Sequence, residues 1–231
     1  MKFDSQSIDT VQRIDKKETM KTRIIFLFCL LGALTLPAQA QTRYETAEEG
    51  SWVEVVGDST LHGWSARSTE PTEGSYLEMD PAWWDAQEPA DDPVDLSIAF
   101  DLPADSLQSG RRGLDRNMHD ALQVNEYPLI SYRLSSATVR EIKENGDHIL
   151  TLEGEITCAG VSRSAETEVV VTQDDGGRLT LTGSMEMKMT DFGIDPPTAM
   201  FGAIRSADEV EVTFTWTLEP VDADESLRPN R

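Results

Sequence analysis

Cysteine and basic residues are scarce in this sequence. Only 2 of its 231 residues are Cys, which is too few for a disulfide-dense mini-domain or a four-cysteine zinc site. Its 20 Lys and Arg residues stand against 42 Asp and Glu, and the formal net charge is −22. Because phosphates are bound mainly through Lys and Arg, this imbalance excludes a nucleic-acid partner. It also argues against docking on anionic lipid headgroups.

The usual catalytic sequence signatures are missing as well. Residues 63–67 lack the closing glycine of a nucleophile elbow, and the sequence has no metalloprotease, Cys-x-x-Cys, phosphate-loop or dinucleotide motif. The three histidines, His62, His119 and His148, stand apart in sequence, and no carboxylate pair can be singled out among so many acids. We therefore expect no catalytic residue and no metal site. An uncharacterised hydrolase stays as the weaker alternative.

The first 40 residues have the pattern of a secretion signal. Lys21 and Arg23 precede an apolar run over 24–36, and residues 37–40 end in an Ala-x-Ala pattern. The run is shorter than the roughly 20 residues that cross a bilayer. We expect a cleavable signal peptide that is cut after Ala40, with Met20 as the true start and 1–19 as an N-terminal extension. The protein is then periplasmic or secreted, with no stable membrane anchor.

Removal of this segment changes the composition of what remains. The first 40 residues hold six of the basic and four of the acidic residues, so the rest carries 14 and 38, a net charge of −24. Cys158 becomes the single cysteine, so the mature chain has no internal disulfide, and we expect this thiol to be a small buried side chain. At 39% hydrophobic residues the chain is too apolar for a disordered acidic protein.

Alternation of apolar and polar residues predicts an all-β domain. It is clearest over 179–189 and 210–218, where apolar residues recur at every second position, as in strands with one buried face. Shorter runs of this kind occupy 52–56, 59–67, 94–101, 129–140, 148–157 and 165–172. Turn residues at 145–147 and 174–177 separate neighbouring runs. This spacing is typical of a barrel or a sandwich.

Two stretches depart from the strand pattern. Residues 114–124 have helical spacing, with Asp115 as the expected N-cap and Pro128 as the stop. Residues 80–93 combine prolines with acidic residues and are expected to form a loop. The pair Trp83-Trp84 in that loop either packs over the sheet or caps the mouth of a cavity.

Several strings occur in an order that carries a resemblance. They are STLHGW at 59–64, MHDAL at 118–122 with YPLI at 127–130, LEGEIT at 152–157 with GVSR at 160–163, and MTDFGI at 189–194 with PPTA at 196–199 and DEV at 208–210. Together they resemble the YceI-like family over about residues 52–219. Met189 stands where many members of that family carry an Arg, and 80–93 looks like extra length.

The resemblance implies a fold and a function. The fold is an antiparallel lipocalin-like β-barrel of about eight strands with one short accessory helix. The apolar tunnel of such a barrel holds a polyisoprenoid chain such as a quinone tail, for sequestration or transport, without enzymatic activity or a cofactor. The chain then divides into an extension and signal peptide (1–40), the barrel domain (41–219) and a disordered acidic tail (220–231).

The two clearest strand patterns supply the candidate wall of such a tunnel. An eight-stranded barrel can hold one small ligand, and Met side chains adapt to irregular apolar partners. A row of apolar side chains such as Met185, Met187 and Met189 is more often part of a packed core than a ligand wall, so a structural or stress-related secreted barrel with a filled core stays an alternative. The expected partner is an apolar isoprenoid or another lipid, and a homodimer stays open. The candidate wall residues are Leu179, Leu181, Met185, Met187, Val212, Phe214 and Trp216.

Overall fold

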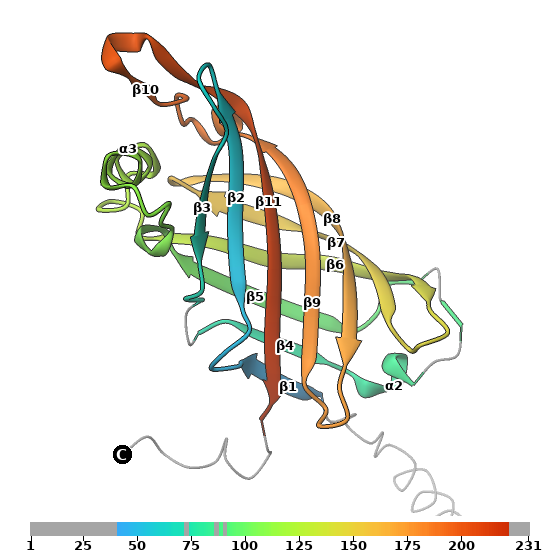
Figure 1. Cartoon of the computed structure of the whole chain (residues 1–231). Coiled ribbons are helices and arrows are strands. Elements are labelled where there is room, and N and C mark those ends of the chain that lie inside the picture. The colour runs from blue at the N-terminus through green and yellow to red at the C-terminus, as the bar shows by residue number, and fades with distance from the viewer. Residues whose placement is uncertain (1–40, 72–73, 86–87, 90–91, 222–231) are drawn as a thin grey trace, which may run out of the picture. The chain divides into compact units, whose positions relative to one another are not determined.

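A closed barrel of antiparallel strands forms the body of the protein in the computed structural model (Figure 1). Each strand pairs with the next in the order β1-β4-β5-β6-β7-β8-β9-β11, and β1 also pairs with β11, which closes the ring. The predicted eight-stranded antiparallel barrel is therefore confirmed. Its strands are β1 (Thr42–Thr46), β4 (Tyr76–Met79), β5 (Leu96–Pro103), β6 (Leu129–Ile142), β7 (His148–Cys158), β8 (Val161–Gln173), β9 (Leu179–Lys188) and β11 (Ile204–Pro220).

The structure describes residues 41–71, 74–85, 88–89 and 92–221. The expected signal peptide, the Met20 start and the cleavage site lie outside this part of the chain. At the other end β11 reaches Pro220, and the Val221 N–H donates to Arg43 O. The rest of the expected tail lies outside the described residues.

The long strand β11 carries two partners along one edge. Its residues 206–215 pair with β2 (Trp52–Ser59), and its residues 218–220 pair with β1. Strand β3 (Trp64–Ser68) continues from β2, and the short β10 (Thr198–Ala199) folds back on the start of β11. The β2–β3 hairpin therefore extends the barrel wall on one side of β11, while β9 pairs along its other edge.

The strand expected over 59–67 is interrupted. Residues 60–63 form a turn between β2 and β3, because the Ser59 hydroxyl replaces strand pairing with local hydrogen bonds. Its Oγ accepts from the Leu61 and His62 N–H groups and donates to His62 O at 2.7 Å. Ser and Gly favour turns of this kind. The strand prediction was wrong for these residues.

The predicted helix exists as α3 (Arg112–Leu122), but Asp115 is not its N-cap. The helix starts earlier, at an Arg111 cap that makes no side-chain hydrogen bond. The Asp115 carboxylate instead accepts from the Ser109 N–H (2.7 Å) and Oγ–H (2.5 Å). Pairing with the preceding loop therefore outweighs the local capping preference of Asp.

A second short helix, α2 (Pro81–Trp84), occupies part of the expected 80–93 loop. The Asp80 side chain accepts from the Ala82 N–H at 2.8 Å, and Pro81 fits the first helical position. Single 3₁₀ turns complete the architecture: η1 (Ala104–Ser106), η2 (Met189–Phe192) and η3 (Met200–Gly202). Neither of the described helices is both long and apolar enough to cross a membrane.

One end of the barrel, near β1 and β4, is filled by its own side chains. We call it the filled end; its centre is a cluster of side chains that are at most 2% exposed: Leu77, Met79, Leu150, Leu179 and Leu218. Trp83 and Trp84 pack against this cluster, and the Trp84 ring stacks on His148 with 4.1 Å between centroids. Of the two alternatives for this pair, the structure shows packing.

Candidate functional site

The other half of the barrel encloses an apolar cavity of about 220 Å³. Side chains from β2, β3, β5, β6, β7, β8, β9 and β11 line it, together with α3 and the segment that follows β9. Among the candidate wall residues, the structure brings these six together on its lining: Leu181, Met185, Met187, Val212, Phe214 and Trp216.

Leu179 does not line the cavity. It points to the same side of β9 as Leu181, but it pairs with Leu218 in the filled end and is 0% exposed. Leu179 lies in the packed core because it is closer to the filled end of the barrel, and not because its side chain faces another way. Alternation identifies which residues face inward and carries no information on depth.

The wall between β9 and β11 is built from cross-strand pairs. Met185 lies opposite Val212, Met187 opposite Val210, and Leu181 opposite Trp216. Side chains directly opposite on one face of an antiparallel pair are in contact distance, so these pairs form a continuous apolar surface. The two Met side chains are only partly buried, since the cavity lies beside them.

Two glycines shape the cavity by making room for aromatic rings. A Cβ at Gly183 would lie 2.8 Å from the Phe214 ring and 3.0 Å from Glu168 O. A Cβ at Gly154 would lie 2.6 Å from the Tyr132 ring and hydroxyl. Each ring therefore crosses the neighbouring strand at a glycine. A glycine within a strand-like run indicates that another group approaches the backbone closely. The sequence did not indicate which aromatic ring approaches each glycine.

Helix α3 closes the side of the cavity with one apolar face. Leu114, Met118, Ala121 and Leu122 follow the i, i+4, i+7, i+8 spacing of a single helix face, and all four line the cavity. The helical spacing was recognised in the sequence. That this face completes the cavity wall was not predicted.

Phe100 and Trp216 form the floor between the cavity and the filled end. Their rings meet edge to face, with centroids 5.3 Å apart. The Trp216 indole N–H donates to Thr46 Oγ1 at 3.0 Å, so this buried polar group is satisfied. The ring is 4% exposed and is held in place by both contacts.

The polar atoms of the lining are few, and most are engaged. Thr167 Oγ1 donates to Ser184 O at 3.0 Å, and Lys188 directs its ammonium to Glu209 at 3.7 Å. Burial raises the pKa of the Cys158 thiol to about 11, so it stays protonated at neutral pH. The polar residues of the lining, with this thiol, are Ser131, Tyr132, Cys158, Thr167, Lys188 and Ser206.

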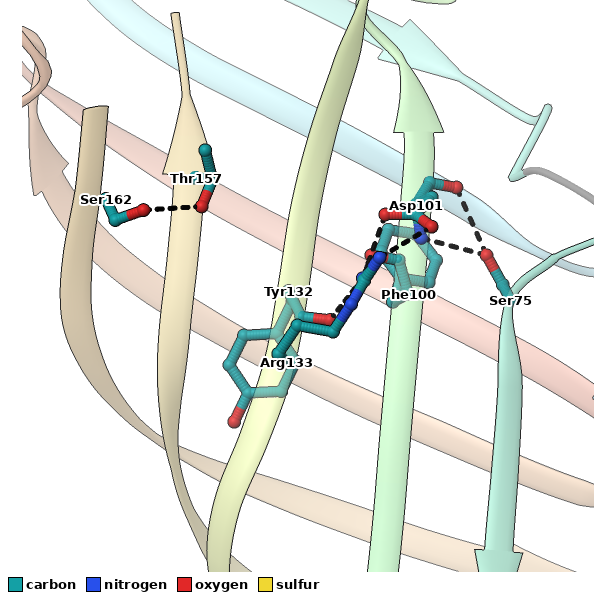
Figure 2. Close-up of polar contacts among 7 residues, drawn as sticks. All are labelled: Ser75, Phe100, Asp101, Tyr132, Arg133, Thr157 and Ser162. Carbon is teal, nitrogen blue, oxygen red and sulfur yellow. Dashed lines mark hydrogen bonds and ion pairs between the residues drawn. The ribbon is translucent and has the colours of Figure 1, made fainter. Parts of the chain in front are cut away.

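Tyr132 differs from these groups because its polar atom is both buried and unpaired within the described part of the chain. Its hydroxyl is buried and has no hydrogen-bond partner among the described residues. Burial raises its pKa to about 12, which keeps the phenol neutral and able to donate. Figure 2 shows this hydroxyl directed away from the neighbouring Arg133, which binds Asp101 and Phe100 O. The site therefore contains a buried hydroxyl donor that no described residue satisfies.

The histidines do not contribute to the cavity. One ring nitrogen of each lies within hydrogen-bond distance of a backbone carbonyl: His62 with Gly63 O (2.9 Å), His119 with Leu107 O (2.8 Å) and His148 with Gly146 O (3.0 Å). Within the described ranges, no group of three or more His, Cys, Asp or Glu is placed to hold a metal ion. The described lining also holds no His, Asp or Glu.

The strings noted in the sequence contribute to this architecture. Asp208 accepts from the Thr190 N–H (2.9 Å) and Oγ–H (2.7 Å), which fixes η2 against β11. Phe192 follows in η2 and lines the cavity. Between β7 and β8, Gly160 has φ +75°, and a Cβ there would meet the Tyr127 ring at 2.4 Å. Thr157 and Ser162 share a hydrogen bond of 2.8 Å beside this turn (Figure 2).

Comparison with known proteins agrees with this fold. The crystal structure of BcnA from Burkholderia cenocepacia matches with a TM-score of 0.55 at 18% identity, over 72% of this chain and 95% of that one. A polyisoprenoid binding domain from Saccharophagus degradans, implicated in plant cell wall breakdown, matches with a TM-score of 0.55 at 14% identity, over 77% and 98%. No curated protein matches the sequence. A model of the YceI-like domain matches residues 71–218, and the chain therefore belongs to the YceI-like family.

Proposed function

We propose that this protein holds an apolar polyisoprenoid-type lipid, such as a quinone tail, in its cavity for sequestration or transport. The observation that carries the proposal is the cavity itself, which is enclosed by hydrocarbon, thioether and aromatic side chains. The S. degradans relative described as a polyisoprenoid binding domain supports the same ligand class. The absence of His, Asp and Glu from the described lining favours binding over hydrolysis.

The size of the cavity suits a segment of such a chain. Its volume of about 220 Å³ exceeds the roughly 150 Å³ of an apolar protein cavity that takes up benzene. Each buried methylene contributes about 0.8 kcal/mol, so affinity should rise about fourfold per added carbon until the cavity is full. A longer chain then extends beyond the cavity, where further carbons add little.

Tyr132 supplies the one polar preference that we propose for this ligand. Its unpaired phenol can donate to a carbonyl or hydroxyl oxygen of a bound lipid. Because a buried unpaired donor is costly, a ligand that carries such an oxygen should be preferred to a pure hydrocarbon of the same length.

Uptake of a small isoprenoid by two neighbouring variants tests the proposal. Met185→Asp places a charge on the cavity wall, whereas Ser184→Asp places the same charge on the exposed face of the same strand. We expect Met185→Asp to weaken farnesol binding at least tenfold, and Ser184→Asp to bind as the wild type does. Circular dichroism of both variants checks that the barrel is intact. Equal binding by a folded Met185→Asp variant, or no farnesol binding by the wild type, would refute the proposal.

We also propose that the protein acts in the periplasm or outside the cell. The support is the basic, apolar and small-residue pattern of residues 21–40. N-terminal sequencing of protein purified from the producing cells should begin at Gln41. A mature chain that retains the apolar run 24–36 would contradict this.

A further inference from the structure

Two large apolar side chains project from neighbouring hairpin tips. Leu61 lies in the turn between β2 and β3 and is 65% exposed, and Phe201 lies in η3 between β10 and β11 and is fully exposed. Phe201 also has φ +58°, a left-handed backbone conformation that aromatic residues rarely adopt. The backbone therefore holds this ring out in solvent at an energetic cost, which is more typical of an interaction site than of a passive loop.

Hydrogen bonds hold the two tips together. The Thr60 N–H donates to Arg205 O at 3.0 Å, and the Arg205 N–H donates to Thr60 Oγ1 at 3.2 Å. Ser59 pairs with Ser206 just below them. Figure 1 shows the β2–β3 turn and β10 at the same end of the barrel, opposite β1 and β4.

The tips lie beside the cavity. Trp64 follows Leu61 closely in sequence, and Pro197 and Ser206 flank Phe201; all three line the cavity. The filled end is at the opposite end of the barrel. A surface that contacts the two tips therefore faces the open half of the barrel rather than the packed half.

The tips are also free of the acidic residues that dominate the chain. Residues 59–69 and 196–207 contain no Asp or Glu, although 42 of the 231 residues are acidic. Each tip carries a basic or titratable group instead, His62 on one and Arg205 on the other. The tips themselves therefore add no negative charge that would repel a lipid headgroup layer.

We propose that Leu61 and Phe201 insert into the surface of a lipid bilayer and place this end of the cavity at the membrane, from which the apolar ligand enters. This inference rests on the proposed lipid-binding function. Two side chains on separate tips offer far less than the roughly 800 Å² per partner of a stable protein interface. A fluid bilayer takes up such projections without a complementary shape. Each buried side chain favours partition by roughly tenfold to a hundredfold, so the contact is weak and reversible.

Flotation with vesicles of phosphatidylcholine tests the docking step. The double variant Leu61→Ser/Phe201→Ser should lose at least tenfold in its partition coefficient, and high salt should leave binding of the wild type unchanged. The matched control is Leu129→Ser, which removes a 41% exposed leucine from the start of β6 and should float as the wild type does. Equal flotation of the wild type and the double variant would overturn the proposal. So would a wild-type dimer, seen by sedimentation without lipid, that the double variant dissociates.

A second readout separates this proposal from the lipid-binding function on which it rests. Neither Leu61 nor Phe201 lines the cavity, so the double variant should bind dissolved farnesol with wild-type affinity. It should extract a long-chain polyisoprenoid quinone from the same vesicles at least tenfold more slowly. Normal farnesol binding with unchanged extraction would overturn docking alone. Failure of the wild type to bind farnesol would count against the proposed function, whereas flotation that depends on the two tips would still support docking.

Discussion

Replacement of Tyr132 by Phe removes a single buried oxygen and leaves the ring in place. The ring lies over Gly154, where a Cβ would approach it to 2.6 Å, so the aromatic packing should survive the change. The hydroxyl has no partner among the described residues. An unsatisfied buried hydroxyl costs about 1–3 kcal/mol, so Tyr132→Phe should stabilise the lipid-free protein by about 1 kcal/mol.

Ligand binding should change in the opposite direction. If the hydroxyl donates to a bound lipid, the lost hydrogen bond is worth about 0.5–1.5 kcal/mol, or roughly threefold to tenfold in affinity. We therefore expect Tyr132→Phe to bind farnesol threefold to tenfold more weakly, and to bind the hydrocarbon farnesene as well as the wild type does. The ligand pair differs chiefly in the oxygen that the phenol would contact.

Urea unfolding and two titrations measure these effects, and Tyr44→Phe is the matched control. Tyr44 lies in the filled end, is 5% exposed, and has a side-chain hydrogen bond with Gln173. Its replacement should destabilise the barrel by about 1 kcal/mol without changing the affinity for either ligand. The reasoning would be refuted if Tyr132→Phe destabilised the protein as Tyr44→Phe does. Equal losses of affinity for farnesol and farnesene would refute it as well.

Two further predictions concern stability. Leu179→Ala should lower the free energy of unfolding by about 3–5 kcal/mol, because Leu179 is 0% exposed in the filled end. Met185→Ala on the same strand should lower it by less than about 1.5 kcal/mol, because the cavity already lies beside Met185. Similar urea midpoints for the two variants would contradict the division of the barrel into a filled and an open half. Burial raises the pKa of Asp101, but hydrogen bonds from Arg133 and Ser131 outweigh burial and hold the pKa below its ordinary value of 3.8. The ionised Asp101 therefore stabilises the fold fully above that pH, and this contribution disappears as the pH falls through the folded-state pKa. Unfolding free energies measured from pH 6 to pH 2.5 should therefore fall less steeply in acid for Asp101→Asn than for the wild type, and parallel curves would disprove the assignment.

Much of the barrel could be predicted from local pattern. The period of two in β9 and β11 places every second side chain on one face, and six of the seven candidate wall residues line one cavity. The strands β1 and β4 went unpredicted because four or five residues are too few for alternation to stand out. Asp115 was misassigned as an N-cap because a carboxylate near a helix start can serve the first turn or the preceding loop, and only the folded loop places Ser109 beside it.

By itself the sequence determined the inward face of each clear strand, the segment of the main helix and the apolar character of the interior, because all three follow from spacing along the chain. Only the tertiary structure decided how deep each inward residue lies. Leu179 and Met185 share a strand and a face and both lie opposite β11, yet Leu179 meets Leu218 in a filled layer and Met185 borders open space. The same holds for Tyr132 and for the tips at Leu61 and Phe201. Whether a polar atom is left unpaired, or an apolar one uncovered, depends on partners that are distant in the chain and adjacent only in the closed barrel.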